Sequence, residues 1–463
     1  MEKKGPRAKS AYPVLHVEVH EPGGRTSSGW LSCMIGEHLH FSTEELSYYC
    51  FARWQPVVFD ALLVAAAVEF CDRSQKRAVH HWAREFHLRI PVHELDRWNQ
   101  GKVKKTLRDA LSFLTGDRWY IEFTPRKVPQ PVPDQSHFEI SGTSHAIVPF
   151  SEGMDSRAVA SLVAKELGKD KILRVRLGSK ASDKESPTHY GHPFASVPYR
   201  VHEGSSSFTE TSARSRGFKF ASISGLAAYL TKASQVIVPE SGQGSLGPAF
   251  VPVGQVYEDY RNHPLFMDLM ESFLESLLEY RPRYYFPRLW HTKGETLRDF
   301  VRECEDGPTW GSTWSCWQSA RQSSVDGHKR QCGICAACML RRQSVHAAGL
   351  TENKESYIWE NLGASTFEKG AATNFKGITN AMREYAIAGT LHLDHLATLR
   401  SSEAGRNTVD LCAFQLSRSQ KLQEEDVSAK LGRLLDQHER EWRSFMNSLG
   451  KRSFLAHWVA DAR

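Results

Sequence analysis

The stretch HAIVPFSEGMDSRAVASLVAKEL, residues 145–167, decides the fold expected for this chain. Its first six residues form an apolar run typical of a short buried strand, and residues 157–167 have the composition of a helix. The loop between them, Ser151-Glu-Gly-Met-Asp-Ser156, stands where backbone N–H groups and a helix N-terminus can surround an anion. It lacks the lysine of a Walker A motif. Ser, Gly and Asp also form ordinary turns, so these residue types alone do not predict a site. The prediction of an anion site depends on the position of this loop between a strand and a helix.

The same alternation of strand and helix continues along the chain. Residues 171–177 and 235–239 indicate two further strands, and residues 218–233 indicate a helix. The residues between 179 and 215 are rich in Ser, His and Gly, and indicate an insertion long enough to be functional. Strands that alternate with helices predict an α/β fold with a parallel sheet and right-handed crossovers.

Four of the nine cysteines are clustered in the spacing C-x15-C-x-x-C-x-x-C. They are Cys316, Cys332, Cys335 and Cys338. Four thiolates at this spacing suit a tetrahedral Zn²⁺, and they leave no open position for a substrate, so the predicted site is structural. Gly333 stands where the chain must turn tightly, which suits a residue that tolerates positive φ. An iron–sulfur cluster is the main rival, while disulfides do not require such clustering.

Composition places the chain among soluble globular proteins. It has 463 residues, enough for two or three domains, with 40% hydrophobic and 24% charged residues. No apolar run approaches the length of a membrane span, and no signal peptide is evident. The other cysteines show no pairing pattern, which favours the cytoplasm. A net charge of +6 permits a nucleotide or RNA partner but does not argue for one.

Four regions are expected along the chain. Residues 1–123 indicate an α+β domain with a buried helix at 57–70, and residues 124–136 hold four prolines and indicate a linker. Residues 137–350 carry the α/β unit and the cysteine cluster. Residues 351–463 indicate a helical region, because apolar residues between 427 and 449 recur at spacings of three and four.

These motifs together resemble a known family. Ser-x-Gly-x-Asp-Ser resembles the PP-loop of ATP pyrophosphatases, and residues 313–341 resemble the cysteine segment of QueC, the 7-cyano-7-deazaguanine synthase. Residues 291–295 and 211–216 are similar to two further QueC segments. The resemblance covers roughly residues 140–350. The added regions resemble the longer QueC-like proteins of bacterial antiphage systems, the QatC type most of all.

The resemblance implies an ATP-dependent carbon–nitrogen ligase in a PP-loop fold. ATP would adenylate the carboxylate of 7-carboxy-7-deazaguanine, releasing pyrophosphate, and an amine would then displace AMP. Ammonia as acceptor leads through the amide to the nitrile, whereas an amine of a protein partner gives a deazaguanine–protein conjugate. The added regions, which a small-molecule synthase does not need, motivate a protein partner from a defence operon.

The resemblance also assigns roles to residues of this chain. Asp155, Arg216 and Lys293 are the expected catalytic residues. ATP and Mg²⁺ are expected at the loop, on Ser151, Gly153, Asp155 and Ser156. Glu152 stands where the family usually has glycine. A carboxylate there repels a triphosphate unless it points away or Arg157 offsets it, which bears on the rate of ATP turnover.

Two other functions stay open from the sequence. One is a catalytically degenerate scaffold in a defence complex, in which Glu152 has removed activity. The other is RNA modification, as in thiolating PP-loop enzymes, which use a reactive cysteine. Cys304 is the one cysteine near the core outside the cluster, and nothing in the sequence indicates a lowered pKa for it.

Overall fold

A computed structural model describes most of the chain, namely residues 14–41, 55–77, 83–127, 145–151, 153–177, 194–197, 199–203, 207–210, 214–252, 257–318 and 324–462. Glu152, Cys50, most of the expected linker and much of the insertion between 179 and 215 lie outside these ranges. The chain forms two compact units. Unit 1 comprises Met1–Pro149, Asp170–Val236 and Phe266–Tyr285; unit 2 comprises Phe150–Lys169, Ile237–Leu265 and Phe286–Arg463. This division differs from the ranges expected from the sequence, because the N-terminal region and the α/β sheet fall in one unit.

The N-terminal part of unit 1 is a four-stranded sheet with the strand order β2-β1-β4-β5. Its strands are β1 (Val14–His20), β2 (Leu31–Met34), β4 (Glu85–Val92) and β5 (Arg118–Pro125). All three strand pairs are parallel. The expected α+β arrangement is therefore wrong here: α2 (Pro56–Ser74) connects toward β4, and α3 (Leu95–Asn99) and α4 (Gly101–Thr115) connect β4 to β5, as parallel pairing requires. The buried helix expected at 57–70 is α2.

The second sheet has the strand order β11-β10-β6-β7-β8. Its strands are β6 (Ala146–Pro149), β7 (Ile172–Leu177), β8 (Phe194–Val197), β10 (Gln235–Ile237) and β11 (Arg283–Tyr285). The pairs of β6 with β7, of β7 with β8 and of β6 with β10 are parallel, which confirms the expected parallel sheet. The chain runs from β6 outward through β7 to β8 and then returns to the other side of β6. The strand order thus reverses between β6 and β10, the place where ligands bind in open α/β sheets.

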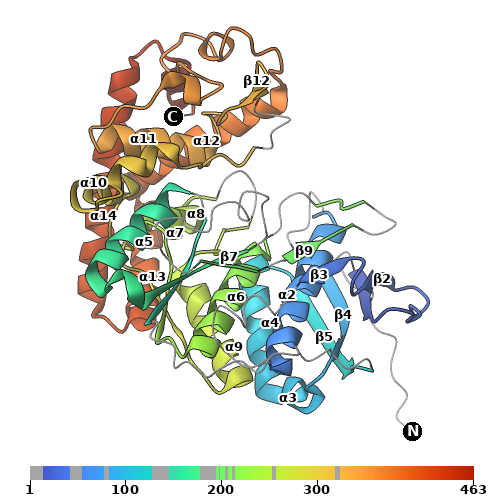
Figure 1. Ribbon diagram of the computed structural model, residues 1–463. Helices are drawn as coiled ribbons and strands as arrows, with labels where there is room; N and C mark the ends of the chain where they lie inside the picture. The colour runs from blue at the N-terminus through green and yellow to red at the C-terminus, as the bar shows by residue number, and fades with distance from the viewer. Residues whose placement is uncertain are drawn as a thin grey trace. The chain divides into compact units, whose positions relative to one another are not determined.

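A buried ion cluster joins the two parts of unit 1. Arg84 is fully buried, and its Nη2 lies 2.7 Å from Oδ2 of Asp117 and also pairs with Asp72. Asp72 Oδ2 accepts a 2.7 Å hydrogen bond from the backbone N–H of Ser215, immediately before α6 (Arg216–Thr231). Helices α2 and α6 pack together (Figure 1). These contacts explain why the N-terminal region is not a separate domain.

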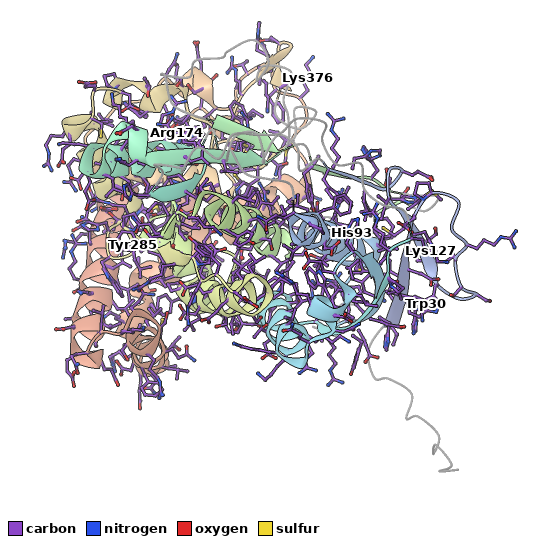
Figure 2. All side chains as sticks on the ribbon, turned by 60° about the horizontal axis from the view of Figure 1, so that its bottom comes forward. Trp30, His93, Lys127, Arg174, Tyr285 and Lys376 are labelled. Atoms are coloured by element: carbon purple, nitrogen blue, oxygen red, sulfur yellow. The ribbon has the colours of Figure 1, made fainter. Side chains whose placement is uncertain are left out.

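One face of the N-terminal sheet carries polar and aromatic side chains in register. The rings of His16 and His87 stack at 4.6 Å, and those of His87 and Tyr120 at 4.8 Å. Trp30 meets His16 edge-on at 5.1 Å, and Figure 2 shows Trp30 at the end of unit 1 that also carries Lys127. The opposite face is the apolar core, where Trp119 is buried.

Unit 2 is mainly helical in its described residues. Its longer helices are α5 (Met154–Leu167), α10 (Lys293–Glu303), α11 (Ala336–Ala347), α12 (Asn380–Thr398), α13 (Glu403–Gln420), α14 (Glu424–Leu449) and α15 (Phe454–Asp461). The amphipathic face predicted at 427–449 belongs to α14, where it buries Leu431, His438 and Trp442 among others. None of the helices in the described part of the chain combines the length and apolar character needed to cross a bilayer.

Candidate functional site

The loop after β6 leads directly into α5 and leaves the first turn of that helix open. Gly153 is the N-cap residue with extended backbone angles, and no side chain caps the helix. Ser151 Oγ accepts a hydrogen bond from the backbone N–H of Gly153 at 3.2 Å and lies 2.5 Å from Ser156 Oγ. The uncapped N–H groups and the helix dipole favour an anion at this end of α5. The residue beside Gly153, Glu152, is outside the described residues, so its effect on this charge balance stays a prediction.

Lys293 lies against this loop although it is 138 residues away from Asp155 in the sequence. Its ammonium group pairs with Asp155 Oδ2, and both residues are buried. Lys293 is the first residue of α10, which packs beside α5. Among the described residues, no hydrogen-bond donor reaches the buried Oδ1 of Asp155. The pair therefore sets a cation and a carboxylate with one free oxygen next to the open helix end.

A second carboxylate, Glu240, was missed by the sequence analysis. It follows β10, the strand on the other side of the point where the strand order reverses. Burial first, and then the charge of Asp155, raise the pKa of Glu240 to about 8. Asn262 Nδ2 donates to its Oε2 at 3.3 Å. The available signal was its place directly after a predicted strand, ahead of the glycine-rich residues 242–247.

The C-terminal helix α14 holds the start of α10 through its buried polar side chains. Thr292, the N-cap of α10, donates from Oγ1 to Glu441 Oε1 at 2.6 Å. The backbone N–H of Lys293 donates to Gln243 Oε1 at 2.7 Å, and Gln243 Nε2 lies 2.6 Å from His438 Nδ1. These contacts fix the backbone from which the Lys293 side chain extends.

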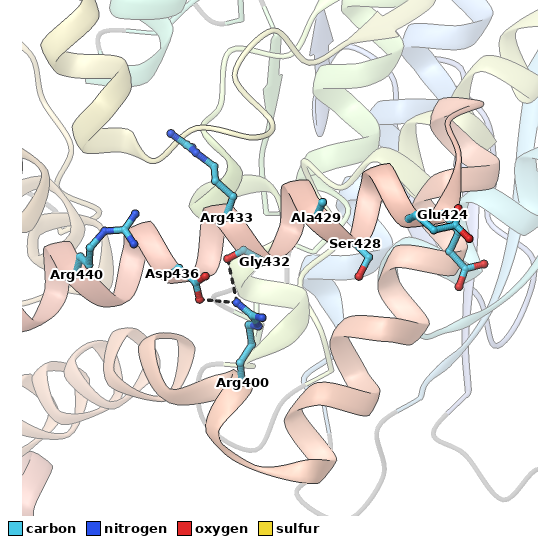
Figure 3. A pocket seen from close by; sticks show the side chains of 9 residues that line it. Arg400, Glu424, Ser428, Ala429, Gly432, Arg433, Asp436 and Arg440 are labelled. Carbon is cyan, nitrogen blue, oxygen red and sulfur yellow. Dashed lines mark hydrogen bonds and ion pairs between the residues drawn. The ribbon is translucent and has the colours of Figure 1, made fainter.

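Arg433 adds an ion pair to the same support. Its Nη1 lies 2.9 Å from Oε2 of Glu295, the residue that completes the capping box of α10. Arg433 and Asp436 both line a surface depression on α14, but Figure 3 shows the Arg433 side chain extending away from Arg400, whereas Asp436 pairs with Arg400. The Arg433–Glu295 pair therefore belongs to the α10 support, while the Arg400–Asp436 pair is a separate surface contact.

His438 makes this support sensitive to acid. Burial lowers its pKa from 6.5 to about 4, because the charged imidazole is disfavoured inside the protein. The unfolded chain then binds the proton more tightly, so the stabilisation is complete above pH 6.5 and is lost as the pH falls toward 4. The free energy of unfolding falls by about 3 kcal/mol over this pH range. We expect His438→Gln, which keeps an acceptor and a donor, to reduce the difference in unfolding free energy between about pH 7.5 and about pH 5. An unchanged difference would contradict this assignment.

The four predicted cysteines converge, which confirms a cluster able to hold a metal ion. All four Sγ atoms lie within 4.8 Å of one another, and those of Cys332 and Cys338 are 3.8 Å apart. Zinc–sulfur bonds of about 2.3 Å in a tetrahedron place the sulfurs about 3.8 Å apart. Backbone N–H groups also point at the sulfurs; for example, Cys332 N lies 3.2 Å from Cys316 Sγ. Gly333 has the predicted positive φ, 82°.

The segment that enters the cysteine cluster also borders the loop of α5. A Cβ atom placed on Gly153 would lie 3.8 Å from the carbonyl oxygen of Trp314, two residues before Cys316. Arg157, on α5, donates to Thr309 O at 3.1 Å and Ser312 Oγ at 2.9 Å. The segment that leads into the cysteine cluster therefore borders one side of the loop.

A buried arginine ties the same segment to the helix after the cluster. Arg341 is fully buried, donates to Thr313 Oγ1 at 2.7 Å and pairs with Glu352 at 2.7 Å. It acts as an internal cross-link.

The predicted catalytic and ATP-binding residues are divided between the two units. The structure brings together Ser151, Gly153, Asp155, Ser156 and Lys293 within unit 2. Arg216 belongs to unit 1, as the first residue of α6, where its guanidinium lies 5.3 Å from the ring centre of Phe220.

The thiol of Cys304 favours its protonated form.

 Burial, followed by the nearby Asp306, raises the pKa of Cys304 to about 11. Because the thiolate is the nucleophilic form, Cys304 does not match the reactive cysteine that a thiolating enzyme needs.

No protein-family model matches the chain, and no curated protein sequence matches it significantly.

Proposed function

We propose that the protein is an ATP-dependent carbon–nitrogen ligase of the QueC type, with a PP-loop formed by Ser151–Ser156. The observation that carries the proposal is the pairing of Lys293 with Asp155 beside the uncapped N-terminus of α5. A triphosphate needs N–H donors, a cation and a carboxylate for Mg²⁺ in one place. The described residues supply all three at the point where the strand order reverses.

The proposed reaction activates a carboxylate that would otherwise resist attack by an amine. A carboxylate oxygen of 7-carboxy-7-deazaguanine attacks the α-phosphorus of ATP, and pyrophosphate leaves with the bonding electrons. The nitrogen of an amine then attacks the carbonyl carbon of the mixed anhydride, AMP leaves, and the amine loses a proton. With ammonia, the oxygen of the amide attacks a second ATP and pyrophosphate leaves; AMP then departs with that oxygen, and loss of the nitrogen-bound protons gives the nitrile.

Each residue has a role that its position supports. The N–H groups at Gly153 and the first turn of α5 would bind the phosphates, together with the hydroxyls of Ser151 and Ser156. Lys293 would neutralise charge that develops as pyrophosphate leaves. Mg²⁺, held by the free oxygen of Asp155, would supply further neutralisation. Arg216 remains a proposed phosphate contact on the resemblance alone.

We assign Zn²⁺ to the four-cysteine cluster, with an iron–sulfur cluster as the rival. Four thiolates close the coordination sphere, so the metal would hold the segment that borders the loop and take no part in the reaction. For the acceptor we propose ammonia or an amine of a protein partner, the latter within an antiphage system in the cytoplasm. The regions outside residues 137–350 motivate the protein partner, since the synthase chemistry does not need them.

The test is release of AMP and pyrophosphate from ATP and Mg²⁺ in ammonium-free buffer. With 7-carboxy-7-deazaguanine we expect release of pyrophosphate in this buffer and release of AMP once ammonium is added as the acceptor. With 7-deazaguanine, which lacks the carboxylate, we expect neither. Release without the acid would contradict the proposed substrate. ATP binding without release, even after ammonium is added, would instead support the scaffold function.

A further inference from the structure

We infer that β5 is a docking edge for an extended, acidic segment of a partner protein, which adds a strand to the N-terminal sheet. The inference goes beyond the proposed reaction and does not depend on it. β5 stands at one end of the strand order β2-β1-β4-β5, so among the described residues it is paired with β4 alone. An edge strand presents backbone N–H and C=O groups with which a second chain can pair.

The middle of β5 directs backbone groups away from β4. The N–H groups of Arg118 and Arg126 each donate at 2.9 Å to a carbonyl oxygen at or beside an end of β4. The direction of these groups alternates along a strand, because its backbone repeats every two residues. The N–H and C=O groups of Trp119, Ile121 and Phe123 therefore face the outer side of β5. A partner strand can form a ladder with them.

β5 lacks several features that usually protect an edge strand from pairing. It is eight residues long, whereas β2, the strand at the other edge, has four. Its register with β4 runs from Arg118 to Pro125 without a bulge. Its single proline, Pro125, is the last residue and leaves the middle of the strand unobstructed. Native proteins use short strands, bulges and prolines to block such pairing, so this edge is suited to accept another strand.

A surface depression of about 300 Å³ lies along β5. Lys104 and Arg108 of α4 line it, together with Tyr120 and Glu122 of β5 and other residues. Tyr120 is 51% exposed, and its ring stacks on that of His87 at 4.8 Å. A rigid aromatic ring offers a large contact area at a low cost in conformational entropy. Tyr120 is therefore suited to anchor a side chain of the added strand.

The charges that line the depression favour an acidic partner. Glu122 pairs with Arg89 at 3.1 Å, so its charge is already offset. Lys104 and Arg108 have no carboxylate partner among the described residues, and Arg108 is exposed. These two cations can therefore pair with carboxylates of an added strand. A second copy of this chain would bring the same cations together across a two-fold axis, which like-charge repulsion disfavours.

The experiment measures the binding of a fluorescein-labelled peptide to the full-length protein by fluorescence anisotropy. The peptide alternates Glu and Val residues and is as long as β5, so it can add a strand and present carboxylates on one face. We expect saturable binding. A peptide that alternates Glu and Pro has the same charge but cannot extend a sheet, because proline disrupts strand pairing. It should bind at least about tenfold more weakly, since the ladder of hydrogen bonds is lost.

Two variants and a control locate the binding on β5. Ile121→Pro removes one outward N–H group at a half-buried position, and the double variant Lys104→Glu/Arg108→Glu reverses the two cations of α4. Each should weaken binding of the Glu-Val peptide by at least about tenfold. Lys105→Glu is the control, because Lys105 also lies on α4 but is 68% exposed and pairs with Asp109. It should bind the peptide as the wild type does. Circular dichroism verifies that each variant is folded.

Several results would overturn the inference. Equal binding of the Glu-Val and Glu-Pro peptides would show that charge alone holds them, without strand addition. Wild-type affinity in both Ile121→Pro and the double variant would place the peptide elsewhere on the protein. Tighter binding of single-stranded oligothymidylate than of the Glu-Val peptide, at the same salt concentration, would identify a nucleic-acid surface instead. A dimer of the wild type that Ile121→Pro dissociates would assign the edge to a second copy. None of these measurements involves ATP, so they are separate from the test of the proposed function.

Discussion

Cys335→Ser is expected to abolish metal binding by the cysteine cluster and to prevent the protein from accumulating in soluble form. Cys335 is fully buried, begins α11 as its N-cap, and accepts a hydrogen bond from Cys338 N through its Sγ at 3.4 Å. Structural zinc contributes about 10–16 kcal/mol in zinc peptides, whereas a whole domain is stable by only about 5–15 kcal/mol. The loss of one ligand therefore threatens the fold itself.

The measurement is the metal content per chain together with the soluble yield. Cys412→Ser is the matched control, because Cys412 is also buried in unit 2 but lies on α13, outside the cluster. It should retain a full complement of metal. A Cys335→Ser protein that is soluble and fully loaded would show that the four sulfurs do not act as one site. If the wild type contains iron and absorbs strongly in the visible range, the cluster holds iron–sulfur rather than zinc.

Asp155→Asn and Lys293→Met are each expected to lower AMP release by about 10²–10³-fold, the usual effect of removing one electrostatic contact to a developing charge. Each single change also leaves a buried charge without its partner, so it should destabilise the protein. The double variant removes both charges. It should regain stability without regaining activity, because residues that act as a unit lose activity non-additively.

The comparison requires turnover and unfolding measurements on the same samples. Lys165→Met, which removes a lysine of α5 that is 55% exposed and pairs with Glu303, is the control and should leave both quantities nearly unchanged. Wild-type turnover in Asp155→Asn would remove the loop from the mechanism. A double variant less stable than both single variants would show that the two charges do not compensate each other.

Much of the fold could be predicted because it depends on local patterns. The apolar runs predicted at 145–150 and 171–177 contain parallel strands, and the spacing of three and four residues in 427–449 belongs to one amphipathic helix. The α+β expectation for residues 1–123 failed, because a short apolar strand does not reveal the direction of its neighbour. That direction follows from the helices that return the chain to the same edge of the sheet.

The sequence by itself determined the cysteine cluster and the strand–loop–helix around Gly153, because both consist of residues close together in the chain whose geometry the backbone dictates. Only the tertiary structure brought Lys293 to Asp155, set Glu240 at the end of the neighbouring strand, and put His438 and Glu441 behind α10. These contacts join residues far apart in sequence. They depend on strand order and helix packing, which no local pattern of side chains encodes.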